Sequence, residues 1–219
     1  MSGAATYRDE LRYPSLMSAS LRNLWLIWPQ VLAYLAVVTV LGLSMPLFGG
    51  RSGGIVGFFV YFGGQYWLFH SLLRKRGLLQ TGRIHFVSFV ALALLLILPI
   101  AFGLAMLIVP GLFLVARWIA APAFIVARGE GTVAAAGISA AAVRGQTANV
   151  MTAIVVLVLI VIALITVLAG VDRVLGNPLN DALLDRVAGH FVPLMMLGLS
   201  VATYEQLGPE DTSIEDVFG

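Results

Sequence analysis

The chain has 219 residues, of which 60% are hydrophobic and 11% are charged, and its formal net charge is +2 at pH 7. Soluble domains carry about 25% charged residues, so this composition excludes an ordinary water-soluble fold and indicates a membrane protein. The small net charge argues against a nucleic-acid partner, and the absence of cysteine excludes disulfides and thiolate chemistry.

Apolar runs long enough to cross a bilayer recur along the chain, since each crossing needs about 20 apolar residues. We therefore expect an all-α integral membrane protein built as a single polytopic domain. An N-terminal interfacial segment covers 1–27, six transmembrane helices cover 28–206, and an acidic tail covers 207–219. Two short amphipathic helices are expected to lie in the interface beside this bundle.

The first part of the chain is predicted to form one of these interfacial helices and two spans. Apolar residues recur at helical spacing after Pro14, and Trp25 and Trp28 suit the headgroup layer. Span one is expected over 28–47, and span two over 55–73 after a glycine-rich loop. Glycines on span two allow close approach of another helix, so the sequence leaves a homo-oligomer open.

A basic cluster follows span two and consists of Arg74, Lys75, Arg76 and Arg83. Two interpretations are open. These side chains contact anionic lipids, at about 1 kcal/mol per residue near the surface, or they are the ordinary topology signal that keeps a loop in the cytoplasm.

The region 84–127 is predicted to form a transmembrane helical hairpin. It holds 44 residues with a single charge. At about 1.5 Å per helical residue it would be about 66 Å long, close to two crossings. Pro110 lacks a backbone donor and Gly111 tolerates positive φ, so we expect the turn at this pair. Spans three and four then cover 86–109 and 112–126.

The single charge of the hairpin is Arg117, which is followed by Trp118. It lies six positions after Gly111, so about 9 Å from the expected turn. A charge there costs at least about 2.5–3.5 kcal/mol unless it is paired, hydrated or near phosphates. Arg117 either contacts an anion or lipid headgroup in a cavity open to the outer side, or is a structural charge that holds the hairpin in register.

The segment after the hairpin contains a candidate ion pair and a helix of small residues. Glu130 is expected to pair with Arg128, Arg144 or the basic cluster, or to serve as a proton or ion site. The helix over 132–143 has little apolar surface, so we expect it to lie along the membrane or against the bundle.

The last third of the chain is predicted to contain two spans separated by the second interfacial helix. Span five covers 148–170. Asn177 and Pro178 suit an N-cap and first helical position for an amphipathic helix over 179–187. Span six is expected over 190–206.

The distribution of cations predicts the orientation. With six spans, one side of the membrane holds nine Lys and Arg residues and the other side holds three. Cytoplasmic loops carry the excess of positive charge, so both termini are expected to be cytoplasmic.

A motif runs through residues 110–145 and consists of Pro110-Gly111-Leu112-Phe113-Leu114, Arg117-Trp118, Ala121-Pro122, Glu130, Ala135, Ser139 and Gly145. In these residues the chain resembles a family of bacterial inner-membrane proteins, the YciC-like proteins, and the similar membrane domain fused to some glycerophosphodiester phosphodiesterases. The resemblance implies a multi-pass protein of the bacterial inner membrane and gives a weak hint of lipid-related work.

Known catalytic patterns are not found in the sequence. Neither Ser139 nor Ser200 lies in a Gly-x-Ser-x-Gly elbow, and there is no phosphate-binding glycine loop or His-Glu-x-x-His motif. We therefore expect a non-enzymatic protein without cofactor or metal, acting in membrane-lipid organisation or as a scaffold for membrane proteins. Its partners are then membrane lipids, other membrane proteins or a second copy. The alternative is a small transporter or channel, with polar residues such as Gln65 lining a path.

Overall fold

The computed structural model describes residues 13–44, 50–175 and 179–207, and within them all regular structure is α-helical. Three stretches are long and apolar enough to cross a membrane, and the bent pair α1–α2 would make a fourth. The expected all-α fold is therefore confirmed, and the apolar helices suggest a membrane protein, whereas the six spans and the cytoplasmic termini stay predictions. The helices are α1 (Tyr13–Leu26), α2 (Trp28–Ser44), α3 (Gly50–Lys75), α4 (Phe86–Met106), α5 (Ile108–Trp118), α6 (Ala121–Arg128), α7 (Thr132–Ala142), α8 (Thr147–Leu175) and α9 (Leu179–Leu207).

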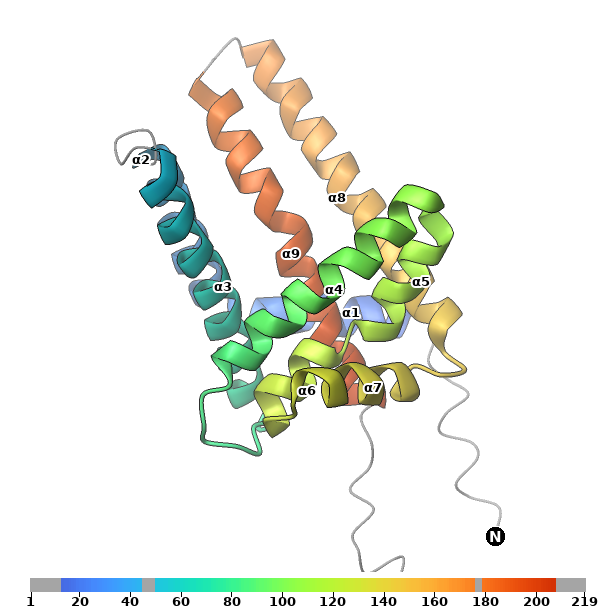
Figure 1. The fold of residues 1–219 in the computed structure, drawn as a ribbon. Helices are drawn as coiled ribbons and strands as arrows, with labels where there is room; N and C mark the ends of the chain where they lie inside the picture. The colour runs from blue at the N-terminus through green and yellow to red at the C-terminus, as the bar shows by residue number, and fades with distance from the viewer. Residues whose placement is uncertain (1–12, 45–49, 176–178, 208–219) are drawn as a thin grey trace, which may run out of the picture.

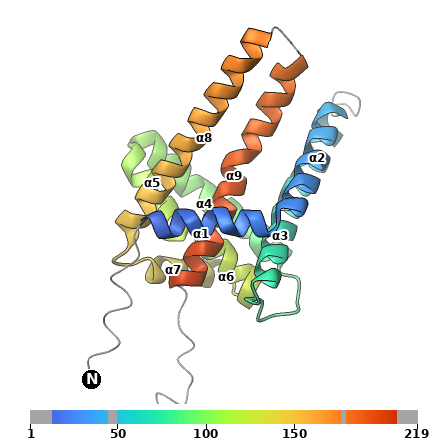
Figure 2. The same cartoon turned by 180° about the vertical axis from the view of Figure 1, so that it is seen from behind.

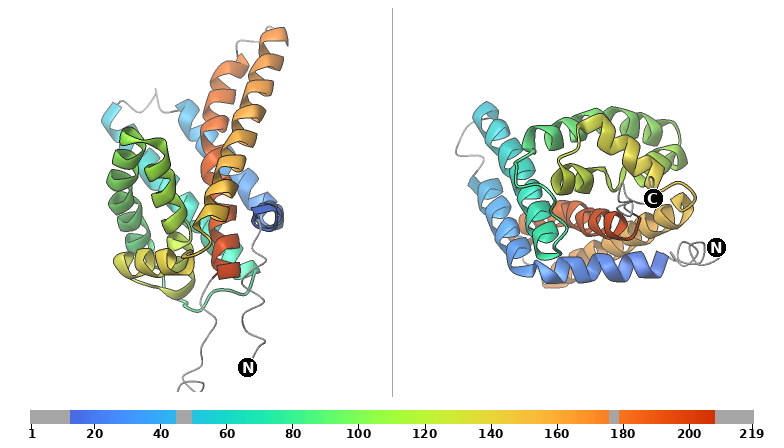
Figure 3. Two further views of the ribbon diagram at one scale, coloured as in Figure 1. Left: turned by 90° about the vertical axis from the view of Figure 1, so that its right-hand side faces the viewer. Right: turned by 90° about the horizontal axis from the view of Figure 1, so that it is seen from below.

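Helix α9 is the centre of the bundle, because it contacts α1, α2, α3, α6 and α8 (Figure 3). One end of the molecule is formed by the C-terminal ends of α2 and α8 and by the N-terminal end of α9. Helices α6 and α7 and the C-terminal end of α9 lie at the opposite end (Figure 1). The N-terminal α1 runs across the bundle rather than along it, as the view from behind shows (Figure 2).

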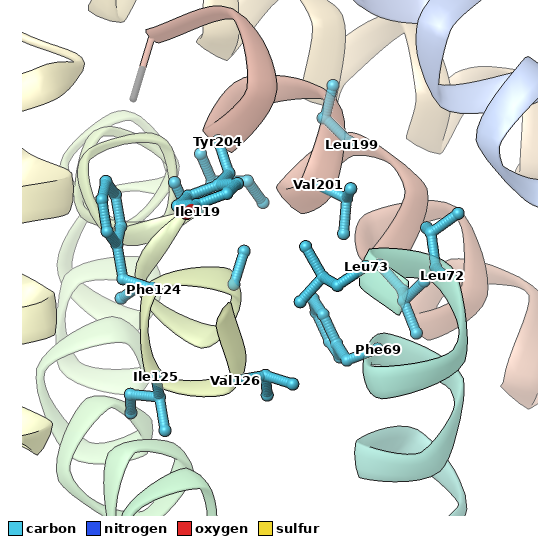
Figure 4. Packing of buried hydrophobic residues seen from close by; sticks show 14 of the residues in the cluster. Phe69, Leu72, Leu73, Ile119, Phe124, Ile125, Val126, Leu199, Val201 and Tyr204 are labelled. Atoms are coloured by element: carbon cyan, nitrogen blue, oxygen red, sulfur yellow. The ribbon is translucent and has the colours of Figure 1, made fainter. Parts of the chain in front are cut away.

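The tightest packing surrounds α6. Six of its eight residues are buried, and the Phe124 ring meets the Tyr204 ring of α9 edge to face with centroids 4.8 Å apart. Figure 4 shows Phe69 and Leu72 of α3 near Val201 of α9, in the cluster of buried residues that includes α6. In contrast, only 17% of the apolar window of α4 is buried, as expected for a helix that faces lipid.

Helix α1 meets α2 at a bend of 74°. One face of α1, which includes Leu16, Ser20 and Asn23, is buried. The Ser20 hydroxyl donates to the Met195 carbonyl at 3.4 Å, and Gly198 allows this approach because a Cβ there would lie 2.9 Å from the Ser20 carbonyl oxygen. The direction of α1 is therefore set by its packing on α9.

The turn of the hairpin lies at Leu107, not at the expected Pro110-Gly111 pair. Leu107 is extended (φ −157°, ψ 134°), and Pro110 lies in the first turn of α5, where a missing N–H leaves no helical bond unmade. Gly111 serves close packing instead: a Cβ on Gly103 would lie 2.9 Å from the Gly111 Cα. The two helices thus touch backbone to backbone just below the turn.

Two expected element boundaries also change. The glycine-rich loop before span two is partly helical, because α3 already begins at Gly50. The second interfacial helix is not separate: residues 179–187 continue into the 29-residue α9, which contains Pro193 in its interior. No other proline precedes Pro193 in α9, and neighbouring helices can satisfy the carbonyl that a proline frees. Asn177 and Pro178, the predicted N-cap pair, and the acidic tail over 208–219 lie outside the described residues.

Candidate functional site

Two of the four side chains in the basic cluster, Lys75 and Arg76, contact α1. Lys75 Nζ donates to the carbonyl of Leu26 at 2.9 Å and so caps the C-terminal end of α1. Arg76 Nε donates to the side-chain oxygen of the fully buried Asn23 at 2.9 Å. Lys75 and Arg76 therefore have protein partners, and Arg74, Lys75 and Arg83 are exposed. Contact of the four side chains with anionic lipid stays a prediction.

Arg76 also reaches α9, because its guanidinium lies 3.6 Å from the Glu205 carboxylate. One side chain at the end of α3 thus fastens both α1 and α9. Replacing Arg76 by methionine is expected to lower the free energy of unfolding by about 1–2 kcal/mol, because the buried oxygen of Asn23 loses its donor. SDS titration in mixed micelles, followed by circular dichroism, measures this loss.

The matched control is Arg74→Met, which removes the same charge from the same helix end. Arg74 is exposed, so its replacement is expected to change stability by no more than about 0.5 kcal/mol. Equal losses in the two variants would contradict the assignment of Arg76 as a fastening residue.

Arg117 lies about 15 Å along α5 from the turn at Leu107, farther than the 9 Å expected, since the turn comes earlier. Its guanidinium lies over the Phe113 ring, 5.6 Å from the centroid. Trp118 does not share its surroundings: it lines a cavity of about 210 Å³ between α4–α5 and α9, together with Leu96 and Met196. The contact of Arg117 with an anion or headgroup stays a prediction.

Helix α5 ends directly after Arg117 and Trp118, and Ser139 of α7 hydrogen-bonds to backbone groups on both sides of this break. The buried Ser139 hydroxyl donates to the Arg117 carbonyl at 2.9 Å and accepts from the Ala120 N–H at 3.2 Å. Pro122 follows in the first turn of α6 and contributes no N–H of its own. Ser139, which is part of the family resemblance, is therefore a structural residue that links α7 to the α5–α6 break.

The residues of the candidate ion pair are not brought together. Within the described part of the chain, Glu130 forms no ion pair, and the ion pair present joins Arg76 to Glu205. Arg128 instead donates to the Tyr204 hydroxyl at 3.2 Å and lies over the Phe124 ring. The sequence could not show this, because Tyr204 comes from a distant span.

A polar cluster that the sequence analysis did not assemble lies between α2, α3 and α9. The Gln65 amide donates to the Tyr34 hydroxyl at 3.3 Å, and that hydroxyl lies 3.3 Å from His190 Nδ1. Tyr34 and Gln65 are buried. By contrast, Thr152 and Thr166 of α8 each bond a carbonyl of their own helix. Polar groups of the spans therefore meet at Tyr34, Gln65 and His190.

A depression on the described surface, which we call the elbow groove, lies where α1 bends into α2 against α9. Its volume is about 630 Å³, within the range of about 300–1,000 Å³ typical of ligand sites. Apart from one cation, its lining is apolar. The walls include Arg22, Trp25, Trp28, Leu32, Phe191 and Met195.

The sequence analysis singled out some residues of this groove but could not show that they lie together. Trp25 and Trp28 were expected in the headgroup layer, and Trp25 is indeed 76% exposed. Arg22 was only one of the nine cations counted to predict the orientation in the membrane. The groove exists because α9, about 170 residues later in the chain, brings Phe191 and Met195 to the elbow.

The chain was compared with protein-family models, with curated proteins and with solved structures, and none of the three comparisons finds a match. The resemblance of residues 110–145 to the YciC-like family therefore stays a prediction from its motif.

Proposed function

We propose that this protein is a six-span, non-enzymatic component of the bacterial inner membrane that organises membrane lipids. Besides the three stretches that are long and apolar enough to cross, α2, α3 and α9 complete the proposed six. Helices α3 and α9, with 26 and 29 residues, are about 39 and 43 Å long and exceed a hydrocarbon layer of about 30 Å. The excess of cations on the side of the termini supports a cytoplasmic location for both ends.

The observation that carries the proposal is the elbow groove. A water-filled site would expose polar groups, whereas this groove presents tryptophan, leucine and phenylalanine. It lies beside α1, which runs across the bundle, and next to α2, which meets α1 at a bend of 74°. In the proposed topology this is the level at which the headgroup and hydrocarbon layers meet. Such a surface suits the chain of a lipid.

Native mass spectrometry of the protein released from lipid nanodiscs tests this proposal. We expect one or a few phospholipids to stay bound. Leu32→Trp adds bulk in the groove and is expected to lower the retained fraction at least threefold, whereas Val40→Trp, equally bulky on an exposed position of the same helix, leaves it unchanged. Wild-type protein that retains neither lipid nor a co-purifying partner would contradict the proposal.

The second candidate function is transport, and the cluster of Tyr34, Gln65 and His190 favours it, because ionisable residues within spans are costly and mark functional sites by default. Flux assays in liposomes separate the two functions. Transport predicts proton or ion flux that His190→Phe abolishes. Lipid organisation predicts no flux above that of protein-free liposomes.

A further inference from the structure

We propose that the elbow groove is a binding site for one anionic phospholipid of the cytoplasmic leaflet. In this arrangement the Arg22 guanidinium binds the phosphate and the groove holds an acyl chain. The inference rests on the proposed function and adds to it the class of lipid, the residue that recognises the headgroup and the leaflet.

The first argument is the division of the groove into an apolar floor and one charged edge. Leu32, Phe191 and Met195 line the part formed by α2 and α9, whereas the cation is contributed by α1. A phospholipid has the same division, with a charged phosphate at one end and hydrocarbon at the other. A free inorganic anion would leave the apolar part unused.

The second argument is that Arg22 is exposed and has no hydrogen bond or ion pair within the described part of the chain. Lys75 and Arg76, which contact the same C-terminal half of α1, are by contrast both engaged by protein groups. Helix α1 carries no acidic residue that would neutralise Arg22. A guanidinium suits a phosphate well, because its fork of N–H donors binds two oxygens at once.

The third argument is the position of the aromatic residues. Trp25 lies three residues after Arg22, so the two side chains share a face of α1. Trp28 begins α2 on the other side of the bend. Indole rings collect at the headgroup level of a membrane. Arg22 is therefore placed at the depth of the phosphates, and the groove continues from there toward the hydrocarbon.

The test measures quenching of tryptophan fluorescence by phospholipids with brominated chains. The protein carries Trp67→Phe and Trp118→Phe, so that Trp25 and Trp28, which both line the groove, are the reporters. It is reconstituted in equimolar phosphatidylglycerol and phosphatidylcholine, with either one brominated. The ratio of the two quenching curves gives the preference for the anionic lipid at the groove.

We expect phosphatidylglycerol to be preferred about fivefold, the factor that corresponds to about 1 kcal/mol per interfacial cation. Arg22→Gln is expected to abolish the preference and Arg22→Lys to retain most of it. Arg83→Gln, which removes an exposed cation outside the groove, is expected to change it by less than twofold.

Equal effects of Arg22→Gln and Arg83→Gln would overturn the inference, because the preference would then reflect the charge of the whole surface. So would the absence of any preference in the reporter protein. Either result leaves the proposed function standing if native mass spectrometry still finds retained lipid. If native mass spectrometry finds no lipid retained by the wild-type protein, both this inference and the proposed function are contradicted.

Discussion

Replacing Gly111 by alanine is expected to lower the free energy of unfolding by about 2–3 kcal/mol, near the upper end of the cost of overpacking. The added Cβ would lie 2.5 Å from Leu104 Cγ and 2.6 Å from the Leu104 backbone nitrogen. The side chain of Leu104 can turn away, but its backbone cannot move without separating α4 from α5. SDS titration of the variant and the wild type in mixed micelles measures the difference.

The control for this change is Gly137→Ala on α7. Nothing lies within 4 Å of the Cβ that alanine would add there. Alanine is the better helix former by about 0.8–1.0 kcal/mol, so this variant is expected to be slightly more stable than the wild type. The two glycine variants therefore differ in sign. If Gly111→Ala also proved neutral or stabilising, the close contact between the arms of the hairpin would be refuted.

Removal of the Ser139 hydroxyl is expected to cost about 2–4 kcal/mol, because two buried backbone groups lose their partner at once. In Ser139→Ala the carbonyl of Arg117 and the N–H of Ala120 face an apolar methyl group. Hydrocarbon and close-packed side chains offer no water in exchange. The loss is measured by the same SDS titration, and the hydrogen exchange of Ala120 is expected to accelerate in parallel.

The control for Ser139 is Thr152→Val on α8. Thr152 also donates to a backbone carbonyl, that of Ala148 at 2.9 Å, but it is exposed and the bond lies within one helix. Its loss is expected to change stability by no more than about 0.5 kcal/mol. A loss in Ser139→Ala as small as that in the control would show that the α5–α6 break does not depend on α7.

The features that the sequence predicts well are those set by local chemistry. The bilayer fixes the length of an apolar run, so the hairpin and span five could be recognised from residues alone. Pro122 likewise marks the break between α5 and α6. The turn at Leu107 could not be recognised, because it depends on how closely Gly103 and Gly111 approach each other in space.

The candidate site was predicted less well, because its parts come from distant segments. Arg76 was grouped with its neighbours in sequence, yet its partner Asn23 lies 53 residues earlier. Charge patterns alone do not distinguish a cation that fastens two helices from one that is free to meet lipid. Arg22 was counted only as a charge, since the groove beside it exists only after α1, α2 and α9 have packed together.

The docking of α1 on α9 has a consequence for biosynthesis. The Ser20–Met195 contact joins residues 175 positions apart, so α9 leaves the ribosome long after α1. At about 5–20 residues per second, that wait lasts about 9–35 s. During this interval the side of α1 that carries Ser20 lacks its partner on α9. The docking of α1 is thus a late step in folding, which can follow only after α9 has been synthesised.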